Sequence, residues 1–363
     1  MDAAAILSKV GRNVPDPVVL DTKAYGPWFR MMAAQTTLSD DQLRRRDIGS
    51  LNLQAALGLP GAESLNLDAA VQKLNAWAEA ARQYTEARWH MFLRSPERYE
   101  HSPATFRMLA LVTVLQRHLG VHYNLSFSEG DYNASDSRNL FIHGILAGHG
   151  GTCATLPVLY VAIARRLGYP LRLVEAKEHF FARWEDPRGE RFNIECTSPG
   201  FRRLDDEHYG HRPKPLTEDE LRSGRYLRNL RPREELAAFL CERVNCLIDN
   251  LQLGEALLSC FLAFQFAPED RNVRGKWSVA TVMARALEEA RGKAKLPDYA
   301  RLDLRKVPVP DGTESFERWA APIAREQLQR IAANREFASA RARSHLFGEL
   351  ARGNGRPIGF SNL

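Results

Sequence analysis

The stretch GGTCATLP at residues 150–157 decides how this chain is interpreted, because it places a cysteine directly behind two glycines at the start of a predicted helix. Free N–H groups and the dipole at a helix N-terminus favour a thiolate and can later stabilise an oxyanion. Gly151 lets the backbone and a substrate approach closely, and Thr152 joins it to Cys153. Cys153 is therefore a candidate nucleophile, while the plainer interpretation is a small buried residue.

The helix after Cys153 leads into a predicted three-stranded sheet. Pro157 fits only the first turn of this helix, which is predicted to end at Gly168. Strands are predicted over residues 171–176, 179–184 and 190–195, and the sequence EDPRG forms the turn between the last two. The cysteine helix thus precedes a β-hairpin.

This hairpin brings a histidine and a carboxylate together. If Trp184 pairs with Glu190 across the turn, His179 lies directly opposite Glu195, with side chains about 5 Å apart. Asn193 lies on the same face, diagonal to His179, whereas a shift of one residue would undo the arrangement. We expect Glu195 to bind the Nδ1–H of His179, so that Nε2 faces the thiol.

The order of these motifs resembles the transglutaminase-like superfamily, a circularly permuted relative of the papain proteases. The likeness covers residues 120–201 and rests on four short sequences: GTC at 151–153, LGYP at 167–170, HFFA at 179–182 and ECT at 195–197. The helices before it and the helical tail resemble a bacterial branch of that superfamily. The resemblance implies a cysteine-dependent site. We expect no cofactor and no metal ion there, and no calcium motif is visible.

By this resemblance Cys153 is the nucleophile, His179 the base and Glu195 the orienting acid of a catalytic triad. The remaining motif positions have supporting roles: Asn193, Gly151 and Thr152. The third position departs from the family pattern, in which Asp is usual. Either the strand that carries Glu195 lies slightly further back, or Asn193 orients the base.

The rest of the chain predicts an α+β fold, in which a papain-like core of one helix on an antiparallel sheet is flanked by helices. Apolar residues recur at helical spacing from Leu67 towards Phe92, and a second helix is predicted from Ser102 to Leu119. We divide the chain into four parts: an N-terminal segment (1–60), the catalytic unit with its N-terminal helices (61–201), a charged, proline-containing linker (202–232) and a helical tail (233–363).

The tail contains a possible helical repeat. Ala256, Ala263 and Pro268 fall at the spacing of a 34-residue tetratricopeptide-like helix–turn–helix unit, although an unrelated helical pair would also fit. Residues 321–363 are basic, but no aromatic residues lie between the arginines. We therefore expect a solvated helix face there and no nucleic-acid partner, because single-stranded nucleic acids are usually stacked on aromatic side chains.

Composition is that of an ordinary intracellular protein. The 363 residues are 44% hydrophobic and 26% charged, with a formal charge of +6. Five cysteines form no disulfide framework and no zinc pattern, which is typical of a reducing compartment. The first ten residues lack a signal-peptide pattern, and no apolar run is long enough for a membrane span. We expect a cytoplasmic protein without membrane attachment.

Two functions remain open at this point. The first is a thiol enzyme, a peptidase, amidase or acyl transferase that cleaves an amide or ester of a protein or peptide substrate through an acyl-thioester on Cys153. The second is a catalytically inactive domain that binds a protein partner, with the helical tail as a further contact surface. A metal site built from His143, His149 and His179 fits less well, because its spacing is poor for chelation.

Overall fold

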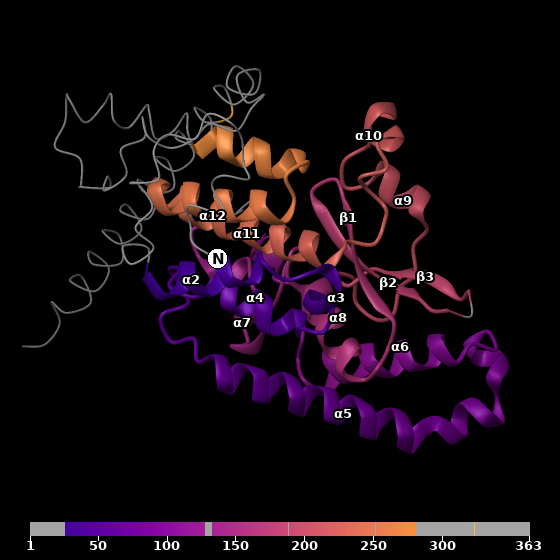
Figure 1. The fold of residues 1–363 in the computed structure, drawn as a ribbon. Helices are drawn as coiled ribbons and strands as arrows, with labels where there is room; N and C mark the ends of the chain where they lie inside the picture. Colours follow the sequence, from indigo (N-terminus) through magenta and orange to yellow (C-terminus); the bar gives the residue numbers. More distant parts are fainter. Residues whose placement is uncertain (1–25, 128–132, 188, 251, 281–322, 324–363) are drawn as a thin grey trace, which may run out of the picture.

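The computed structural model describes residues 26–127, 133–187, 189–250 and 252–280, together with Ile323 (Figure 1). The expectations for residues 1–25 and for the basic stretch at 321–363, Ile323 apart, lie outside the described residues. The helices and strands are α2 (Gly26–Gln35), α3 (Asp40–Arg44), α4 (Ile48–Ala56), α5 (Leu67–Arg94), η2 (Pro96–Tyr99), α6 (Pro103–Thr113), η3 (Val114–His118), η4 (Leu125–Phe127), η5 (Ser137–Asn139), α7 (Ile142–Leu146), α8 (Leu156–Arg166), β1 (Leu171–Ala176), β2 (His179–Glu185), β3 (Arg191–Ile194), α9 (Asp206–His211), α10 (Glu218–Arg222), α11 (Pro232–Asp249) and α12 (Leu253–Phe266).

The two predicted N-terminal helices are present, and capping residues set their ends. Asn66 accepts a hydrogen bond from the Ala69 N–H and starts α5, which runs along one side of the molecule with α6 beside it (Figure 1). Ser102 caps α6 in the same way. The last turn of this second helix is a π-helix, η3, and Gly120 with φ +70° follows it. Polar caps and a glycine stop therefore act where the sequence predicts them.

The sheet has three antiparallel strands in the order β1-β2-β3. The predicted pairing of β2 with β3 is wrong by two residues, because Trp184 pairs with Phe192 and not with Glu190. The turn is tighter than predicted: the Asp186 N–H donates to the Glu190 carbonyl, and Gly189 has φ +88°. Side chains alternate with a period of two, so this shift leaves His179 on the face predicted for it.

Helix α8 lies at the centre of the core, and all residues from Leu156 to Ala164 are buried. It packs against α4 and α5 on one side and against the sheet on the other. This combination of helices with one small antiparallel sheet is the α+β arrangement predicted from the sequence. Among the described helices, none has both the length and the apolar character needed to cross a membrane.

Helices α11 and α12 lie side by side and share this core (Figure 1). Leu236, Leu240 and Val244 of α11 are fully buried in it. Arg165 of α8 forms two hydrogen bonds with Glu235, of 2.6 and 3.1 Å, which tie α11 to the cysteine helix. The division of the chain at residues 202–232 and the tetratricopeptide-like character of the tail stay predictions. Within the described residues, the first two tail helices belong to one continuous core.

Candidate active site

Cys153 lies in a turn directly before α8, whose first helical residue is Leu156. Thr152 builds this turn. Its carbonyl accepts hydrogen bonds from the N–H groups of Thr155 (3.2 Å) and Leu156 (3.0 Å), and its hydroxyl donates to the Asn139 carbonyl (2.9 Å). Among the described residues, the Cys153 N–H has no acceptor. One backbone donor therefore remains free beside the thiol.

Gly151 lies in a closely packed position. A Cβ atom at this position would lie 2.7 Å from Leu156 Cγ and 2.8 Å from Ile145 Cδ1, closer than side chains tolerate. Its carbonyl accepts from the Asn124 N–H and its N–H donates to the His122 carbonyl, at 2.8 and 2.9 Å. The segment before the cysteine is thus fixed from both sides, which fits the close backbone approach predicted for this glycine.

Three side chains from distant parts of the sequence meet beside this turn. His179 opens β2, and Glu195 follows the last residue of β3. His179 Nε2 lies 3.0 Å from Glu195 Oε2, and the Cys153 thiol lies close enough to His179 to raise the pKa of its imidazole. The Cys153 thiol also reaches the carbonyl of Glu178 at 4.0 Å. The structure therefore brings Cys153, His179 and Glu195 together.

The orientation of the imidazole corrects the prediction. We expected Nδ1 on Glu195 and Nε2 on the thiol, but Nε2 bonds to Glu195 and Nδ1 is left for Cys153. The register explains the difference. Because Ala182 pairs with Ile194, Glu195 lies beyond the end of the paired strand and diagonal to His179, where the ring nitrogen farthest from the backbone reaches it.

The carboxylate of Glu195 accepts four hydrogen bonds. Thr197 donates its N–H (2.9 Å) and its hydroxyl (2.6 Å) to Oε1, while the Tyr209 hydroxyl donates to Oε2 at 3.1 Å beside His179. Only 6% of the Glu195 side chain is exposed. A buried carboxylate keeps its charge when its oxygens are saturated with donors in this way. The site therefore holds a fixed negative charge behind the imidazole.

The charges of His179 and Glu195 stabilise each other. Burial alone lowers the pKa of His179, but its hydrogen bonds to Cys153 and Glu195 and the negative charge of Glu195 outweigh burial and raise that pKa to about 9. Burial raises the pKa of Glu195, yet the bond to His179 and the donors of Thr197 lower it to about 2. Near neutral pH the arrangement favours an imidazolium held between a carboxylate and the cysteine.

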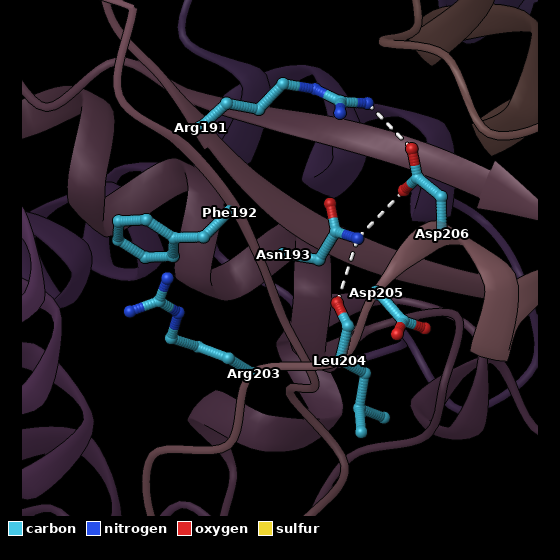
Figure 2. Close-up of a pocket in the computed structure, with 7 residues that line it drawn as sticks. All are labelled: Arg191, Phe192, Asn193, Arg203, Leu204, Asp205 and Asp206. Atoms are coloured by element: carbon cyan, nitrogen blue, oxygen red, sulfur yellow. Dashed lines mark hydrogen bonds and ion pairs between the residues drawn. The ribbon is translucent and has the colours of Figure 1, made fainter.

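Asn193 does not orient His179. It pairs with Arg183 across the hairpin and accepts a 2.7 Å hydrogen bond from the Arg183 Nε. Its amide donates to the Leu204 carbonyl and to Asp206, at 3.0 and 2.8 Å. Figure 2 shows these last two bonds at the edge of a hollow of about 370 Å³ that none of the three site residues lines. Asn193 thus connects β3 to the segment that carries α9.

The remaining histidines and cysteines do not join the site. His143 is buried against the Ser137 hydroxyl, and His149 lies 3.1 Å from an Arg138 nitrogen. In the part of the chain that the structure describes, no group of three or more His, Cys, Asp or Glu side chains could hold a metal ion. Four of the cysteines are free and buried: Cys196, Cys241, Cys246 and Cys260. Cys153 is the cysteine with partial exposure.

Sequence reasoning missed Tyr209 and assigned no role to Thr197. Thr197 lies two residues after Glu195, so the ECT motif contains the signal for its contact. Tyr209 lies in the stretch interpreted as a linker, and no spacing rule connects it to position 195. Its contact arises because α9 packs back against the sheet, which a single sequence does not reveal.

Comparison with known proteins gives one family match. No curated protein and no solved structure gives a match to the chain. A match to a family model begins at the second residue of α5 and ends early in α11, so it includes the cysteine turn, the whole hairpin and α9. That model is described as the transglutaminase-like superfamily, and it matches residues 68–234 of this chain.

Proposed function

We propose that this chain is a cysteine-dependent enzyme that acts on an amide or ester bond through an acyl-thioester on Cys153. The observation that carries the proposal is the 3.0 Å contact between His179 Nε2 and a fully hydrogen-bonded Glu195, with the Cys153 thiol close to the same imidazole. A nucleophile, a base beside it and a third group that orients the base are the general signature of an activated nucleophile.

The reaction follows from these contacts. The Cys153 thiolate attacks the substrate carbonyl, and the free N–H of Cys153 is placed to stabilise the oxyanion that forms. His179, protonated, gives its proton to the departing amine or alcohol as the carbon–nitrogen or carbon–oxygen bond breaks, which leaves the thioester. Water or an amine then gives a proton to neutral His179 and attacks the thioester, which releases the acyl group and restores the thiolate and imidazolium.

The glutamate at the third position is accommodated without a change of role. Glutamate has one more methylene than the usual aspartate, and Glu195 lies one residue past the end of β3. Its oxygens are held by Thr197 and Tyr209, so the longer side chain is not free to move away from His179. We therefore assign the orienting role to Glu195 and not to Asn193. Peptidase, amidase and acyl transferase activities would all use this arrangement.

The test is to trap the acyl-enzyme. The full chain is incubated with a p-nitrophenyl ester, and intact-mass measurement with peptide mapping identifies the acylated residue. We expect one acyl group on Cys153, which hydroxylamine removes, and no adduct with Cys153→Ala or His179→Ala. Cys196→Ala is the matched control, because it removes a buried thiol outside the site and should leave acylation intact. An adduct on another residue, or no adduct, would overturn the proposal in favour of the protein-binding alternative.

A further inference from the structure

We propose that Tyr209 is a positioning residue of this site, whose hydroxyl holds the Glu195 carboxylate in place and whose ring supports the His179 imidazole. The inference rests on the proposed function and adds to it the segment after the hairpin. This segment, residues 205–220, carries α9 and the start of α10. It would then be part of the catalytic unit and not a passive linker.

The hydroxyl contact fixes one oxygen of the acid. Tyr209 Oη lies 3.1 Å from Glu195 Oε2, the same oxygen that His179 uses, and Thr197 holds the other oxygen. Tyr209 is only 1% exposed. Burial and the negative charge of Glu195 raise the pKa of Tyr209, so the phenol stays protonated and always donates. With both oxygens held, the carboxylate cannot rotate away from the imidazole.

The ring of Tyr209 packs beside the imidazole of His179. It stacks on Phe181 with centroids 3.8 Å apart and planes at 4°, and it lies 5.9 Å from the His179 ring at 21°. Phe181 and His179 are two residues apart on β2 and share one face of the strand. One aromatic side chain therefore contacts the acid with its hydroxyl and flanks the base with its ring.

Polar contacts between α9 and the hairpin hold Tyr209 in this position. Asp206, in the first turn of α9, pairs with Arg183, a side chain that is 2% exposed, and accepts from Asn193 at 2.8 Å. Arg191 adds a 2.8 Å ion pair to the same carboxylate (Figure 2). These contacts attach the start of α9 to the hairpin. They also give Asn193 an indirect effect on the site, through Tyr209.

The far end of the segment is attached to the turn between β1 and β2. Lys214 pairs with Glu178 at 2.6 Å and Glu220 pairs with Lys177 at 3.0 Å. Glu178 has φ +60°, a conformation that costs a non-glycine residue energy, and its carbonyl faces the Cys153 thiol. The segment thus contacts the site at the acid, at the base and at the turn next to the nucleophile.

Other titratable groups near Glu195 would not mask the effect of Tyr209. Tyr123, Tyr160 and Cys196 are close enough to feel the negative charge of Glu195. Burial raises the pKa of each of these groups, so all three stay neutral through the pH range in which the site titrates. A change in the pH profile of the thiol after substitution of Tyr209 can then be assigned to the Glu195–His179 pair.

The experiment measures the rate of iodoacetamide alkylation of Cys153 against pH in the full chain. Tyr209→Phe keeps the ring and removes only the donor. We expect alkylation at pH 6 to slow by about threefold to tenfold and the acid limb of the profile to move up by about one pH unit, because Glu195 loses a charge-assisted hydrogen bond. Tyr160→Phe removes another buried hydroxyl and should leave the profile unchanged, since Gln116 keeps its bonds to Ser198 and Gly200.

A purely structural role would lower the melting temperature of Tyr209→Phe without moving the pH profile, and that result would overturn the inference. If Tyr209→Phe does not fold, Asp206→Asn decides, because it loosens α9 and should move the profile in the same direction by a smaller amount. A wild-type thiol with ordinary reactivity would overturn the inference together with the proposed function. If wild-type Cys153 reacts faster than a free thiol but Tyr209→Phe has the same pH profile of alkylation as wild type, the inference alone is overturned.

Discussion

The five cysteines of this chain lie in two kinds of surroundings, and the contrast shows what makes one of them a candidate nucleophile. Cys153 is partly exposed in a turn beside His179. Cys241, Cys246 and Cys260 lie on α11 and α12, where they are at most 8% exposed. Burial raises the pKa of all three, that of Cys246 to about 12. The same residue type is thus kept as a neutral thiol in one region and placed beside a base in the other.

The carboxylates of the two regions differ in the same way. Glu175 on β1 is buried beside Arg225 and Asn272, but the Arg225 contact is long at 3.4 Å and Asp270 lies close by. Desolvation dominates there and raises the pKa of Glu175 to about 7. Glu195 is buried to a similar degree, yet four donors hold its pKa low. Donors to both oxygens thus keep the pKa of Glu195 low, whereas burial with fewer donors raises that of Glu175.

Replacement of Glu195 should have the largest effect on the reactivity of Cys153. Glu195→Gln removes the negative charge and presents the wrong partner to His179, and in a comparable triad the acid-to-amide change costs about 10⁴ in turnover. We expect a loss of this order in the rate of Cys153 acylation, with the fold intact by circular dichroism. Asn193→Ala should cost less, because Asn193 bonds to Arg183, Leu204 and Asp206 and not to His179. If Asn193→Ala proves the more damaging change, the third member of the triad is wrongly assigned.

In the native chain at pH 7, Cys153 should be alkylated at least about a thousandfold faster than Cys246. A thiol with a pKa near 12 is almost never ionised at that pH. Differential alkylation with light and heavy iodoacetamide, read by peptide mapping, gives the five rates in one experiment. In urea all five cysteines should react alike, which serves as the control. Comparable native rates at Cys153 and Cys246 would remove the distinction on which the proposal depends.

The sequence predicts the local features of this fold better than the contacts between distant segments. The start of α5 and the positions of the three strands lie close to those predicted, because caps such as Asn66 and breaks such as Gly168 act locally. The cysteine helix starts at Leu156, later than predicted. The hairpin register was wrong by two residues, since the turn closes at Asp186 and Glu190, but the face of His179 survived the error. The orientation of the imidazole and the contact of Tyr209 depend on packing between distant segments, which no periodicity encodes.

A test of the helical region separates its structural role from the chemistry. Leu240 in α11 is fully buried, so Leu240→Ala should lower the free energy of unfolding by about 2–5 kcal/mol. Leu221→Ala, at a leucine that is 52% exposed, should change it by less than about 0.5 kcal/mol. Urea unfolding measures both. The folded fraction of Leu240→Ala should keep the pH profile of Cys153 alkylation. A changed profile would mean that α11 helps to build the site.

Truncation gives a coarser form of the same test. The sequence predicts a separate helical tail from residue 233, and the shared core and the Arg165–Glu235 bonds lead us to expect that residues 1–230 alone expose apolar surface and lose solubility. Expression of that fragment, with the full chain as control, measures the soluble yield. A soluble fragment with unchanged Cys153 reactivity would restore the two-unit division.

The smallest expected effect is the pH dependence of stability that comes from the His179–Glu195 pair. The pKa of His179 is raised from 6.5 to about 9, so its stabilisation is complete below pH 6.5 and is lost as the pH rises through 9. The pKa of Glu195 is lowered from 4.5 to about 2, so its stabilisation is complete above pH 4.5 and is lost as the pH falls towards 2. The difference in unfolding free energy between wild type and Glu195→Gln should therefore peak at pH 4.5–6.5. We expect about 2 kcal/mol there. Glu97→Gln, at an exposed position, should show no such peak.

The most direct test of the central claim is the alkylation rate of Cys153 as a function of pH, compared between wild type and His179→Ala. We predict that at pH 6 wild-type Cys153 is alkylated much faster than a free thiol and that His179→Ala removes most of this excess. The two profiles should differ most near pH 6. Coincident profiles, with wild-type Cys153 alkylated no faster than a free thiol, would contradict the central claim, because Cys153 would then be an ordinary thiol that only happens to lie beside a histidine.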